Sequence, residues 1–280
     1  MPGYLKSREE VQRIEDFLAP SRHLCDELGI FFKTSWDWAR EVLPPVFEPI
    51  GDRDAGTCDG QVTVAHYESA YCGTYDASIV TIFCSYQGQD GYWMLTEIVS
   101  PESPVVLGRE LWGEAKKNGH GVLRRDGNLY RGTAERMGVS ILEIEATIDG
   151  PELGPRTVEG IGFDIKMFPH SSGRGLEYPP ILNIWNTKFE YTSYREGTGT
   201  LKWGHSKWDP TDTIPILEVG KATATQYACE YPLGRQIELE DPEGIYPQYM
   251  WGRSFDDPTW MPIAQRFRGQ DALNPDPDND

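Results

Sequence analysis

The chain has 280 residues and a net charge of −18, because 44 acidic residues outnumber 26 lysines and arginines. Nucleic-acid backbones and anionic membranes are both bound through basic faces, so this charge argues against either partner. The length fits one large domain or two small ones. Since positive charge is scarce, each lysine in the chain becomes more informative.

The first predicted element is an amphipathic helix over residues 7–18. Ser7 and Glu10 have the spacing of a capping box, and the apolar side chains that follow share one helix face. A second helix is predicted over residues 34–43, because two consecutive prolines follow it and cannot continue it.

From about residue 61 to about residue 230, short β-rich runs are separated by turns of glycine, proline and aspartate. Several runs alternate polar and apolar residues, as half-buried strands do. The runs are 77–86, 91–99, 139–148, 160–168, 181–191 and 214–229. A glycine-rich hairpin loop is predicted over residues 87–91. No β-α-β rhythm is present, so a parallel sheet is not expected.

This pattern predicts an α+β fold that is mostly antiparallel β, with a few helices. No linker divides the chain, so we expect a single domain over residues 1–270 with its core at about residues 28–230. The last ten residues, 271–280, are polar, acidic and proline-bearing, which predicts a disordered tail.

The patterns of cysteine, histidine and apolar residues exclude several classes of protein. The five cysteines and five histidines lack the spacings of metal sites, and no phosphate-binding loop, dinucleotide fingerprint or serine-nucleophile motif occurs. We therefore expect no metal and no cofactor. The first six residues lack the apolar stretch of a secretory signal, and no run reaches the length of a membrane span. A cytoplasmic protein with reduced thiols is the expectation.

The most unusual segment is residues 108–119, Gly-Arg-Glu-Leu-Trp-Gly-Glu-Ala-Lys-Lys-Asn-Gly. Taken alone, Lys116 and Lys117 would be two surface charges. Here they follow an apolar run, lie beside Leu111 and Trp112, and are bracketed by glycines that permit close backbone packing. The pair also lies in the middle of the β-rich region. These features make it the candidate for chemistry.

Residues 108–119 resemble the hallmark of the acetoacetate decarboxylase superfamily, a Gly-Arg-Glu run followed by an aromatic-Gly-x-Pro-Lys-Lys type sequence. Residues 73–76, 85–92 and 220–225 look like further segments of that family, in the right order. The resemblance covers roughly residues 28–230. It implies a decarboxylase-like β-barrel with a few peripheral helices, which assembles as a homo-oligomer.

The resemblance implies that Lys116 forms a Schiff base with a carbonyl substrate and that Lys117 is its catalytic neighbour. The iminium nitrogen would accept the electrons of a breaking carbon–carbon bond. Such a lysine must be neutral to attack, which places its pKa about 3–4 units below the ordinary value of about 10.4. Adjacent side chains diverge in strands and helices, so we expect burial by Trp112 and Val106 to lower this pKa more than Lys117 does.

Two carboxylates are candidates for the acid–base work. The family uses a carboxylate on an early strand in an aromatic-x-Glu setting, and the matching position here is Asp76, which follows Tyr75. Asp76 is one methylene shorter than glutamate, which argues against acetoacetate itself; a turn-capping role is the alternative. Glu114 lies two positions before Lys116, so in an extended segment both face the same side. Glu114 is either a proton shuttle or an exposed acid.

Substrate binding is expected from charged and aromatic side chains. Arg109 of the Gly-Arg-Glu run is a candidate for holding a carboxylate, with a structural salt bridge as the alternative. The arginine that the family carries before the first strand has no match here, since Cys25 or Asp26 falls near its position. Tyr75 and Trp112 are expected to line the pocket.

The aromatic segment 244–260 is expected either to complete the pocket or to pack on the barrel as a hydrophobic flap. Tyr246 or Tyr249 could donate a proton, as tyrosine does in general acid catalysis, and we assign that role to Tyr246 and substrate binding to Tyr249. This aromatic content predicts a keto-acid substrate larger than acetoacetate, with a bulky or aromatic group.

The sequence therefore predicts a carbon–carbon lyase that works through a lysine Schiff base. Decarboxylation of a β-keto acid other than acetoacetate is the first expectation. An aldolase or aldolase-dehydratase that acts on pyruvate and an aldehyde is the alternative within the same chemistry. A non-catalytic barrel that binds a hydrophobic small molecule is the alternative from another class.

Overall fold

The computed structural model describes residues 3–18 and 22–261, so the predicted tail 271–280 lies outside the described residues. The helices are α1 (Arg8–Leu18), α2 (Trp36–Val42), α3 (Glu102–Leu107) and α4 (Tyr246–Ser254), with a π-helical turn η1 (Gly108–Trp112) and the 3₁₀ turns η2 (Thr211–Thr213) and η3 (Pro258–Trp260). The strands are β1 (Arg22–Ser35), β2 (Glu48–Pro49), β3 (Gly51–Asp52), β4 (Thr57–Ser69), β5 (Gly73–Tyr86), β6 (Gln89–Ser100), β7 (Lys116–Asn118), β8 (His120–Asp126), β9 (Leu129–Arg136), β10 (Val139–Thr147), β11 (Arg156–Lys166), β12 (Ile181–Trp203), β13 (Glu218–Glu230) and β14 (Leu233–Glu238).

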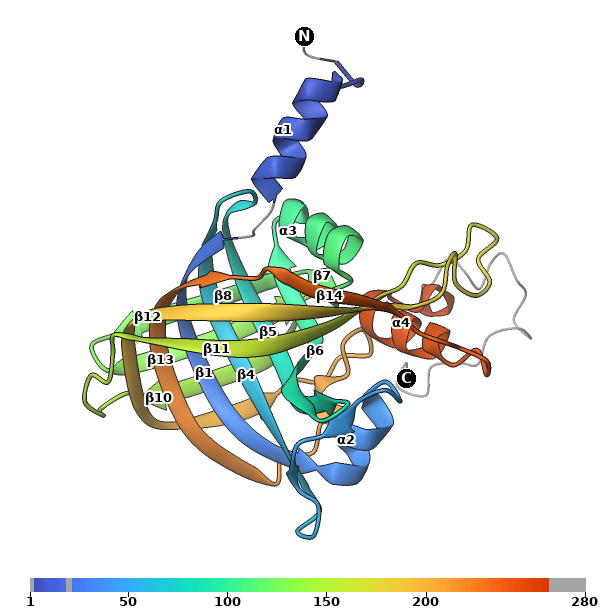
Figure 1. Cartoon of the computed structure of the whole chain (residues 1–280). Coiled ribbons are helices and arrows are strands. Elements are labelled where there is room, and N and C mark those ends of the chain that lie inside the picture. Colours follow the sequence, from blue (N-terminus) through green and yellow to red (C-terminus); the bar gives the residue numbers. More distant parts are fainter. Residues whose placement is uncertain (1–2, 19–21, 262–280) are drawn as a thin grey trace.

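Seven of these strands close into a ring (Figure 1). Their order is β11-β6-β5-β4-β1-β13-β12, and β12 pairs back with β11. Neighbours in the ring are antiparallel except for β11 and β6. The 23-residue β12 extends beyond the ring to pair with β10, to which β9 and β8 add as a second layer. The predicted fold class, mostly antiparallel β with a few helices, is confirmed, and a second parallel pair joins β6 to the short β7.

The two faces of the ring strands differ in chemistry because side chains alternate across a strand. On β4, Val62 and Val64 are fully buried in the main apolar core, while Thr63 and Tyr67 line a cavity inside the ring. Ile144 of β10 belongs to the same core, which joins the ring to the second layer. Burial of each such aliphatic side chain contributes about 1.5–3 kcal/mol. The core therefore stabilises the fold from outside the ring and leaves its interior open.

Both predicted N-terminal helices are present. The backbone N–H of Ser7 donates to Glu10 Oε2 (2.8 Å) and that of Glu10 donates to Ser7 Oγ (3.2 Å), which confirms the capping box. The second helix begins at Trp36 rather than at residue 34, because β1 continues to Ser35, whose hydroxyl caps the helix. None of the described helices is long and apolar enough to cross a membrane.

Candidate active site

Lys116 is the first residue of β7 and lies buried beside two acids. Its side chain is 5% exposed, and its Nζ lies 2.6 Å from Glu114 Oε2 and 3.5 Å from Glu97 Oε1. Glu97 stands directly opposite Lys116 in the parallel pair of β6 and β7, so the backbone fixes their approach. The lysine nitrogen is thus held between two carboxyl groups.

Two glycines of the preceding segment permit this close packing. A Cβ on Gly108 would collide with Glu114 Oε2 and with Lys116 Cδ. Gly113 ends η1 with a φ of 86°, in the left-handed region that favours glycine, and a Cβ there would lie 2.5 Å from the Cα of Lys166. π-helical turns such as η1 are rare and are frequent at functional sites. The glycines therefore allow the turn to pack directly on the lysine and its acid.

Two of the predicted aromatic residues lie beside the lysine. The ring centres of Tyr75 and Trp112 are 5.9 Å and 5.8 Å from Lys116 Nζ. Trp112 is held in place from β12, because Asn183 Nδ2 donates to its carbonyl oxygen (2.7 Å) and Trp185 packs edge-on against its ring. Both Tyr75 and Trp112 line the cavity inside the ring, so they connect the buried lysine to that space.

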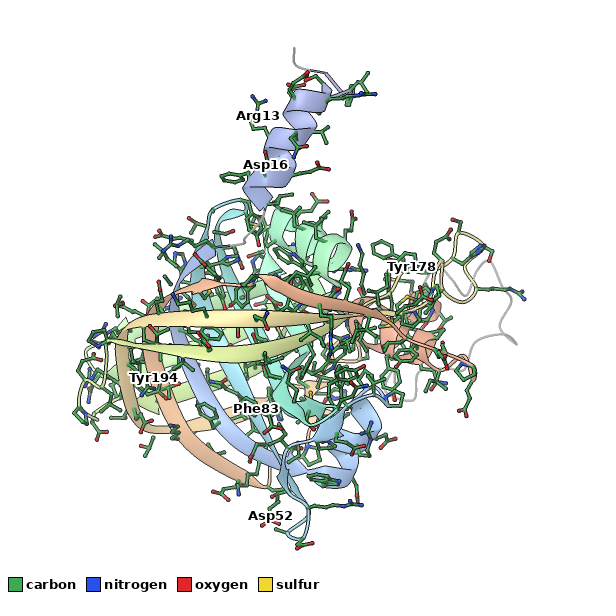
Figure 2. The ribbon with its side chains drawn as sticks, viewed as in Figure 1. Arg13, Asp16, Asp52, Phe83, Tyr178 and Tyr194 are labelled. Atoms are coloured by element: carbon green, nitrogen blue, oxygen red, sulfur yellow. The ribbon has the colours of Figure 1, made fainter. Side chains whose placement is uncertain are left out.

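The cavity inside the ring, called the ring cavity below, has a volume of about 390 Å³ and a largely aromatic wall. Its aromatic lining residues are Phe31, Tyr67, Tyr75, Phe83, Tyr92, Trp112, Trp185, Phe189, Tyr191, Tyr194, Tyr227 and Tyr231. Figure 2 marks two of them, Phe83 on β5 and Tyr194 on β12. The ionisable acids of the lining are Glu27, Glu97 and Asp164, and none of the described lining residues is lysine, arginine or histidine.

The pKa values of this cluster follow from burial and from the excess of acids. Burial lowers the pKa of Lys116, but Glu114 and Glu97 outweigh it and hold that pKa well above its usual range. Burial raises the pKa of Glu97 to about 7, although Lys116 opposes this. The expectation that burial would leave Lys116 neutral is therefore wrong, because the site excludes water but not acids. Val106, which was expected to cover the lysine, is itself exposed on α3.

Asp164 is a third acid near this cluster. It is 2% exposed, and its Oδ1 has no hydrogen-bond partner. Burial raises its pKa well above the usual range, and the charge of Glu114 adds to the effect. Asp164 is therefore a buried acid at the cavity wall whose charged form is disfavoured.

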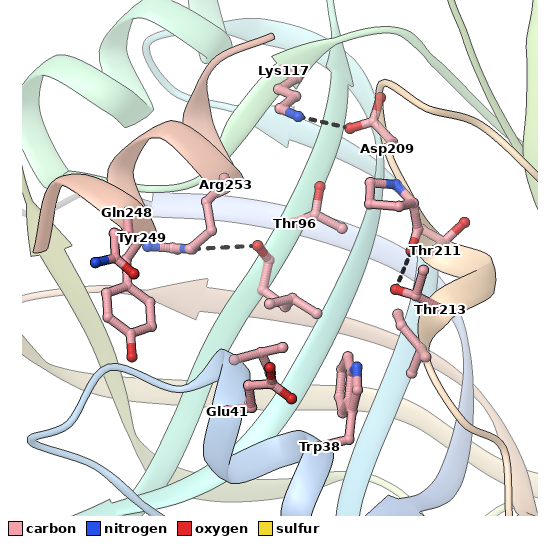
Figure 3. A pocket seen from close by; sticks show the side chains of 15 residues that line it. Trp38, Glu41, Thr96, Lys117, Asp209, Thr211, Thr213, Gln248, Tyr249 and Arg253 are labelled. Carbon is pink, nitrogen blue, oxygen red and sulfur yellow. Dashed lines mark hydrogen bonds and ion pairs between the residues drawn. The ribbon is translucent and has the colours of Figure 1, made fainter. Parts of the chain in front are cut away.

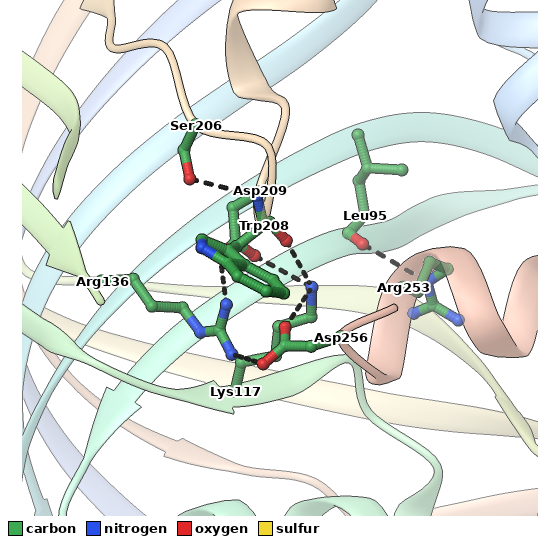
Figure 4. Close-up of polar contacts among 8 residues, drawn as sticks. All are labelled: Leu95, Lys117, Arg136, Ser206, Trp208, Asp209, Arg253 and Asp256. Carbon is green, nitrogen blue, oxygen red and sulfur yellow. Dashed lines mark hydrogen bonds and ion pairs between the residues drawn. The ribbon is translucent and has the colours of Figure 1, made fainter. Parts of the chain in front are cut away.

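Lys117 points away from Lys116, to the outside of the ring. Its Nζ donates to Asp209 Oδ1 (3.0 Å), and Arg136 Nη1 donates to the other oxygen of the same carboxylate (2.6 Å) (Figure 4). Arg136 also donates to Asp256 (2.7 Å), which closes a buried network of ion pairs. The structure therefore does not place the ammonium group of Lys117 beside that of Lys116. Lys117 is instead paired with Asp209 in this network.

The family model for acetoacetate decarboxylase matches residues 11–238. The chain belongs to the acetoacetate decarboxylase family. An acetoacetate decarboxylase of Burkholderia mallei (strain NCTC 10229) is 25% identical over 216 residues, which cover 73% of this chain and 83% of that protein. One of Burkholderia cenocepacia (strain HI2424) is 26% identical over 218 residues, with the same coverage. Membership in this family supports lyase chemistry at a general level.

Solved structures share the fold at lower sequence identity. The acetoacetate decarboxylase of Legionella pneumophila matches with a TM-score of 0.71 and 16% identity, over 85% of this chain and 98% of that one. The enduracididine biosynthesis enzyme MppR, complexed with the condensation product of pyruvate and imidazole 4-carboxaldehyde, matches with a TM-score of 0.68 and 18% identity, over 78% of this chain and 89% of that one.

Two residues that the family resemblance singled out do not lie in the ring cavity. Asp76 follows the inward-facing Tyr75 on β5, so it faces outward, where its Oδ1 lies 2.7 Å from His66 Nδ1. Arg109 packs on the ring of Phe255, with 4.5 Å between its guanidinium carbon and the ring centre. The structure therefore brings neither Asp76 nor Arg109 to Lys116.

The predicted tyrosines of the C-terminal aromatic segment also lie elsewhere. Tyr246 is 2% exposed and packs in the main core. Tyr249 lines a separate cavity of about 380 Å³ outside the ring, together with Lys117 and Asp209 (Figure 3). Of the predicted site residues, Lys116, Glu114, Tyr75 and Trp112 come together, and the others do not.

Sequence reasoning missed three acids of the ring cavity. Glu97 and Asp164 lie in runs that the sequence identified as strands, and Glu27 lies in a strand that it did not identify. The signal that could have found them is an acid inside an otherwise apolar or aromatic strand, because burial of an unpaired carboxylate is costly. That signal shows that an acid is unusual, but the face on which it lies depends on register.

Proposed function

We propose that this protein is a lysine Schiff-base lyase in which Lys116 attacks the carbonyl carbon of a keto acid bound in the ring cavity. The observation that supports this most is the position of Lys116 Nζ. It is buried, lies 2.6 Å from the carboxylate of Glu114, and is flanked by the cavity-lining rings of Tyr75 and Trp112. A nucleophile, a proton acceptor and a substrate-sized space are thus adjacent.

The reaction begins with a proton transfer, because an ammonium group has no electron pair with which to attack. Glu114 accepts a proton from Lys116, and the amine then adds to the ketone carbon. Loss of the former carbonyl oxygen as water leaves an iminium, whose nitrogen accepts the electron pair of the breaking carbon–carbon bond. If that bond leads to a carboxylate, carbon dioxide departs and an enamine remains. Protonation of the enamine carbon and hydrolysis of the iminium release the product and the lysine.

Glu97 is the candidate proton donor for these steps. With a pKa of about 7 it is partly protonated near neutral pH, which suits a group that must both give and take a proton. It lies 3.5 Å from Lys116 Nζ, beside the atom on which the carbinolamine would form. Glu97 would then protonate the departing hydroxyl group or the enamine carbon.

The size and wall of the ring cavity support a substrate larger than acetoacetate. A volume of about 390 Å³ lies in the range of sites for drug-sized ligands, and the wall is largely aromatic. Decarboxylation of a bulky or aromatic β-keto acid is therefore the first candidate reaction.

A cytoplasmic homo-oligomer is the proposed form of the protein, and light scattering on the purified chain tests the oligomer.

An aldolase or aldolase-dehydratase that acts on pyruvate and an aldehyde is the second candidate. The charge of the lining does not separate the two reactions, because pyruvate carries a carboxylate as a β-keto acid does, and none of the described lining residues is lysine, arginine or histidine. The observation that favours the second candidate is a structural neighbour. The structural neighbour MppR, complexed with a condensation product of pyruvate and an aldehyde, is consistent with this chemistry on the same fold.

Borohydride trapping tests the proposal. Reduction in the presence of a panel of keto acids and pyruvate should add the mass of the reduced substrate at Lys116, and Lys116→Arg should abolish the adduct. Carbon dioxide release against carbon–carbon bond formation then separates the two candidate reactions. If no member of the panel gives an adduct, the lyase proposal fails and a cavity that only binds a hydrophobic small molecule remains.

A further inference from the structure

The ring cavity has a second polar position, away from the reactive lysine. Glu27 of β1 lines the cavity, and its Oε2 accepts a hydrogen bond from the hydroxyl of Tyr227 (2.9 Å). Two residues before it, Cys25 pairs with Tyr67 of β4 and with Tyr227 of β13, so both rings flank Glu27. The rings of Tyr191 and Tyr227 lie 5.2 Å apart. Glu27, Tyr67, Tyr191 and Tyr227 are called the Glu27 chamber below.

The Glu27 chamber and the reactive lysine share one cavity. Tyr67 stacks on Tyr75, with ring centres 5.0 Å apart and ring planes 14° from parallel. The ring of Tyr75 in turn lies 5.9 Å from Lys116 Nζ. The stacked rings of Tyr67 and Tyr75 therefore connect Lys116 to the Glu27 chamber, and a substrate long enough to follow them would place its remote end near Glu27.

The charges around this space favour a cation over an anion. The ionisable groups that line the cavity are acids, and the described lining contains no lysine, arginine or histidine. Lys116 is already paired with Glu114 and Glu97, so its charge is locally balanced. Aromatic faces carry partial negative charge and attract cations, and the attraction grows when water is excluded. Arg156 lies outside this lining, with its guanidinium carbon 5.7 Å from the ring centre of Tyr191, but an anion placed beside Glu27 would meet the carboxylate of Glu27 directly.

We propose that the Glu27 chamber binds a cationic nitrogen group of the substrate, such as an ammonium, guanidinium or imidazolium. The carboxylate of Glu27 accepts the hydrogen bond of that group, and the rings of Tyr67, Tyr191 and Tyr227 enclose its apolar part. The hydroxyl of Tyr227 orients the carboxylate. This inference deepens the proposed function, because it defines the remote half of the carbonyl substrate. The binding itself needs no Schiff base.

Three probes of similar shape and different charge test the chamber. Benzylammonium, benzyl alcohol and benzoate lack a carbonyl group that could react with Lys116, so calorimetric titration at about pH 8, above the pKa of Glu27 of about 7, reports binding alone. Benzylammonium should bind at least about tenfold more tightly than benzyl alcohol, since a charge-assisted hydrogen bond is roughly twice as strong as a neutral one. Benzoate should bind more weakly than either. Binding of benzoate as tight as that of benzylammonium would overturn the proposal.

Matched variants distinguish binding of benzylammonium in the Glu27 chamber from binding to the acidic surface of the protein. Glu27→Gln keeps the shape of the side chain and should remove most of the preference for benzylammonium, while benzyl alcohol binds as before. Glu68→Gln removes the same charge from an exposed position on β4 and should change nothing. Tyr227→Phe removes the orienting hydroxyl but keeps the ring, and should weaken benzylammonium binding by a few-fold. Unchanged preference in Glu27→Gln would place the probe elsewhere and refute the inference.

The two proposals can fail separately. Borohydride adducts at Lys116 without any preference for benzylammonium would refute the Glu27 chamber and leave the lyase proposal intact. A clear preference for benzylammonium without adducts from any keto acid would refute the lyase and leave a cavity that recognises cations.

Discussion

At the scale of single residues, the two acids beside Lys116 together outweigh burial in setting the pKa of its amino group. Glu114 at 2.6 Å and Glu97 at 3.5 Å keep the pKa of Lys116 high even though water is excluded. In a site of low dielectric constant such pairs are strong, because less solvent screens them. In the proposed reaction, Lys116 would therefore become a nucleophile only when its proton moves to a neighbour, so proton transfer and attack would be coupled.

The first prediction concerns the proton acceptor. Glu114→Gln removes the carboxylate that we propose takes the proton from Lys116, and general-base catalysis is typically worth about 10²–10⁴-fold. The rate of borohydride-trapped adduct formation at Lys116 should therefore fall by at least about 100-fold near neutral pH. Glu110→Gln, an exposed acid of the same segment, is the matched control and should leave the rate unchanged. Equal rates for both variants would rule out Glu114 as the acceptor.

The second prediction concerns stability against pH at Glu27. Burial raises its pKa from 4.5 to about 7, although the hydrogen bond from Tyr227 opposes this. Between these two values the folded state binds a proton that the unfolded state does not, so the free energy of unfolding falls as pH rises through that window. The wild type should therefore lose at most about 3 kcal/mol relative to Glu27→Gln between about pH 4.5 and about pH 7.

Urea unfolding of the two proteins across this pH range measures the difference. Glu68→Gln, which alters an exposed acid, should follow the wild type at every pH. A stability difference between wild type and Glu27→Gln that is independent of pH would contradict the raised pKa of Glu27.

At the scale of elements, the face on which a side chain lies could be predicted only where a strand is regular. The alternation of side chains along a strand correctly predicted that Lys116 and Lys117 diverge. By the same alternation, Asp76 faces outward because Tyr75 faces inward. Glu97 escaped prediction because β6 has an irregularity: Val80 pairs with Thr96 but Thr81 pairs with Met94, which leaves Leu95 as an extra residue. This bulge switches the inward face from even to odd positions and so brings Glu97 to the lysine.

The third prediction concerns the turn η1. Gly108→Ala adds a methyl group that would collide with Glu114 Oε2 and Lys116 Cδ, so the acid and the lysine must move apart. Adduct formation at Lys116 should fall at least about tenfold, because reacting groups tolerate little displacement. Gly252→Ala, in α4 with open space around its Cβ position, is the control and should keep full activity. A fully active Gly108→Ala protein would mean that the contact between Glu114 and Lys116 is dispensable.

At the scale of the whole molecule, the strand content and the two N-terminal helices followed from the sequence, whereas the way in which the layers connect did not. The sequence predicts a strand over residues 181–191, but β12 continues to Trp203 and belongs first to the ring and then to the second layer. Its pairing with β13 shifts between Tyr191 and Ser193, so one long strand bends from one layer to the other. Long-range pairing of this kind leaves no periodic signal in the strand itself.

The last prediction concerns the buried ion pairs of Lys117, which connect elements that are distant in the sequence. Lys117 of β7, Arg136 of β9, Asp209 after β12 and Asp256 after α4 form one chain of ion pairs, with the Asp209 carboxylate only 2% exposed. Lys117→Met leaves that buried carboxylate with half its partners, and breaking a buried pair costs about 3–5 kcal/mol. The midpoint of urea unfolding should therefore drop clearly, whereas Lys188→Met, which breaks an exposed pair, should cost less than about 1 kcal/mol.

Since Lys117 faces away from Lys116, the folded Lys117→Met variant should still trap substrate within about twofold of the wild-type rate. Loss of trapping at unchanged stability would instead show that the charge of Lys117 acts on the nucleophile.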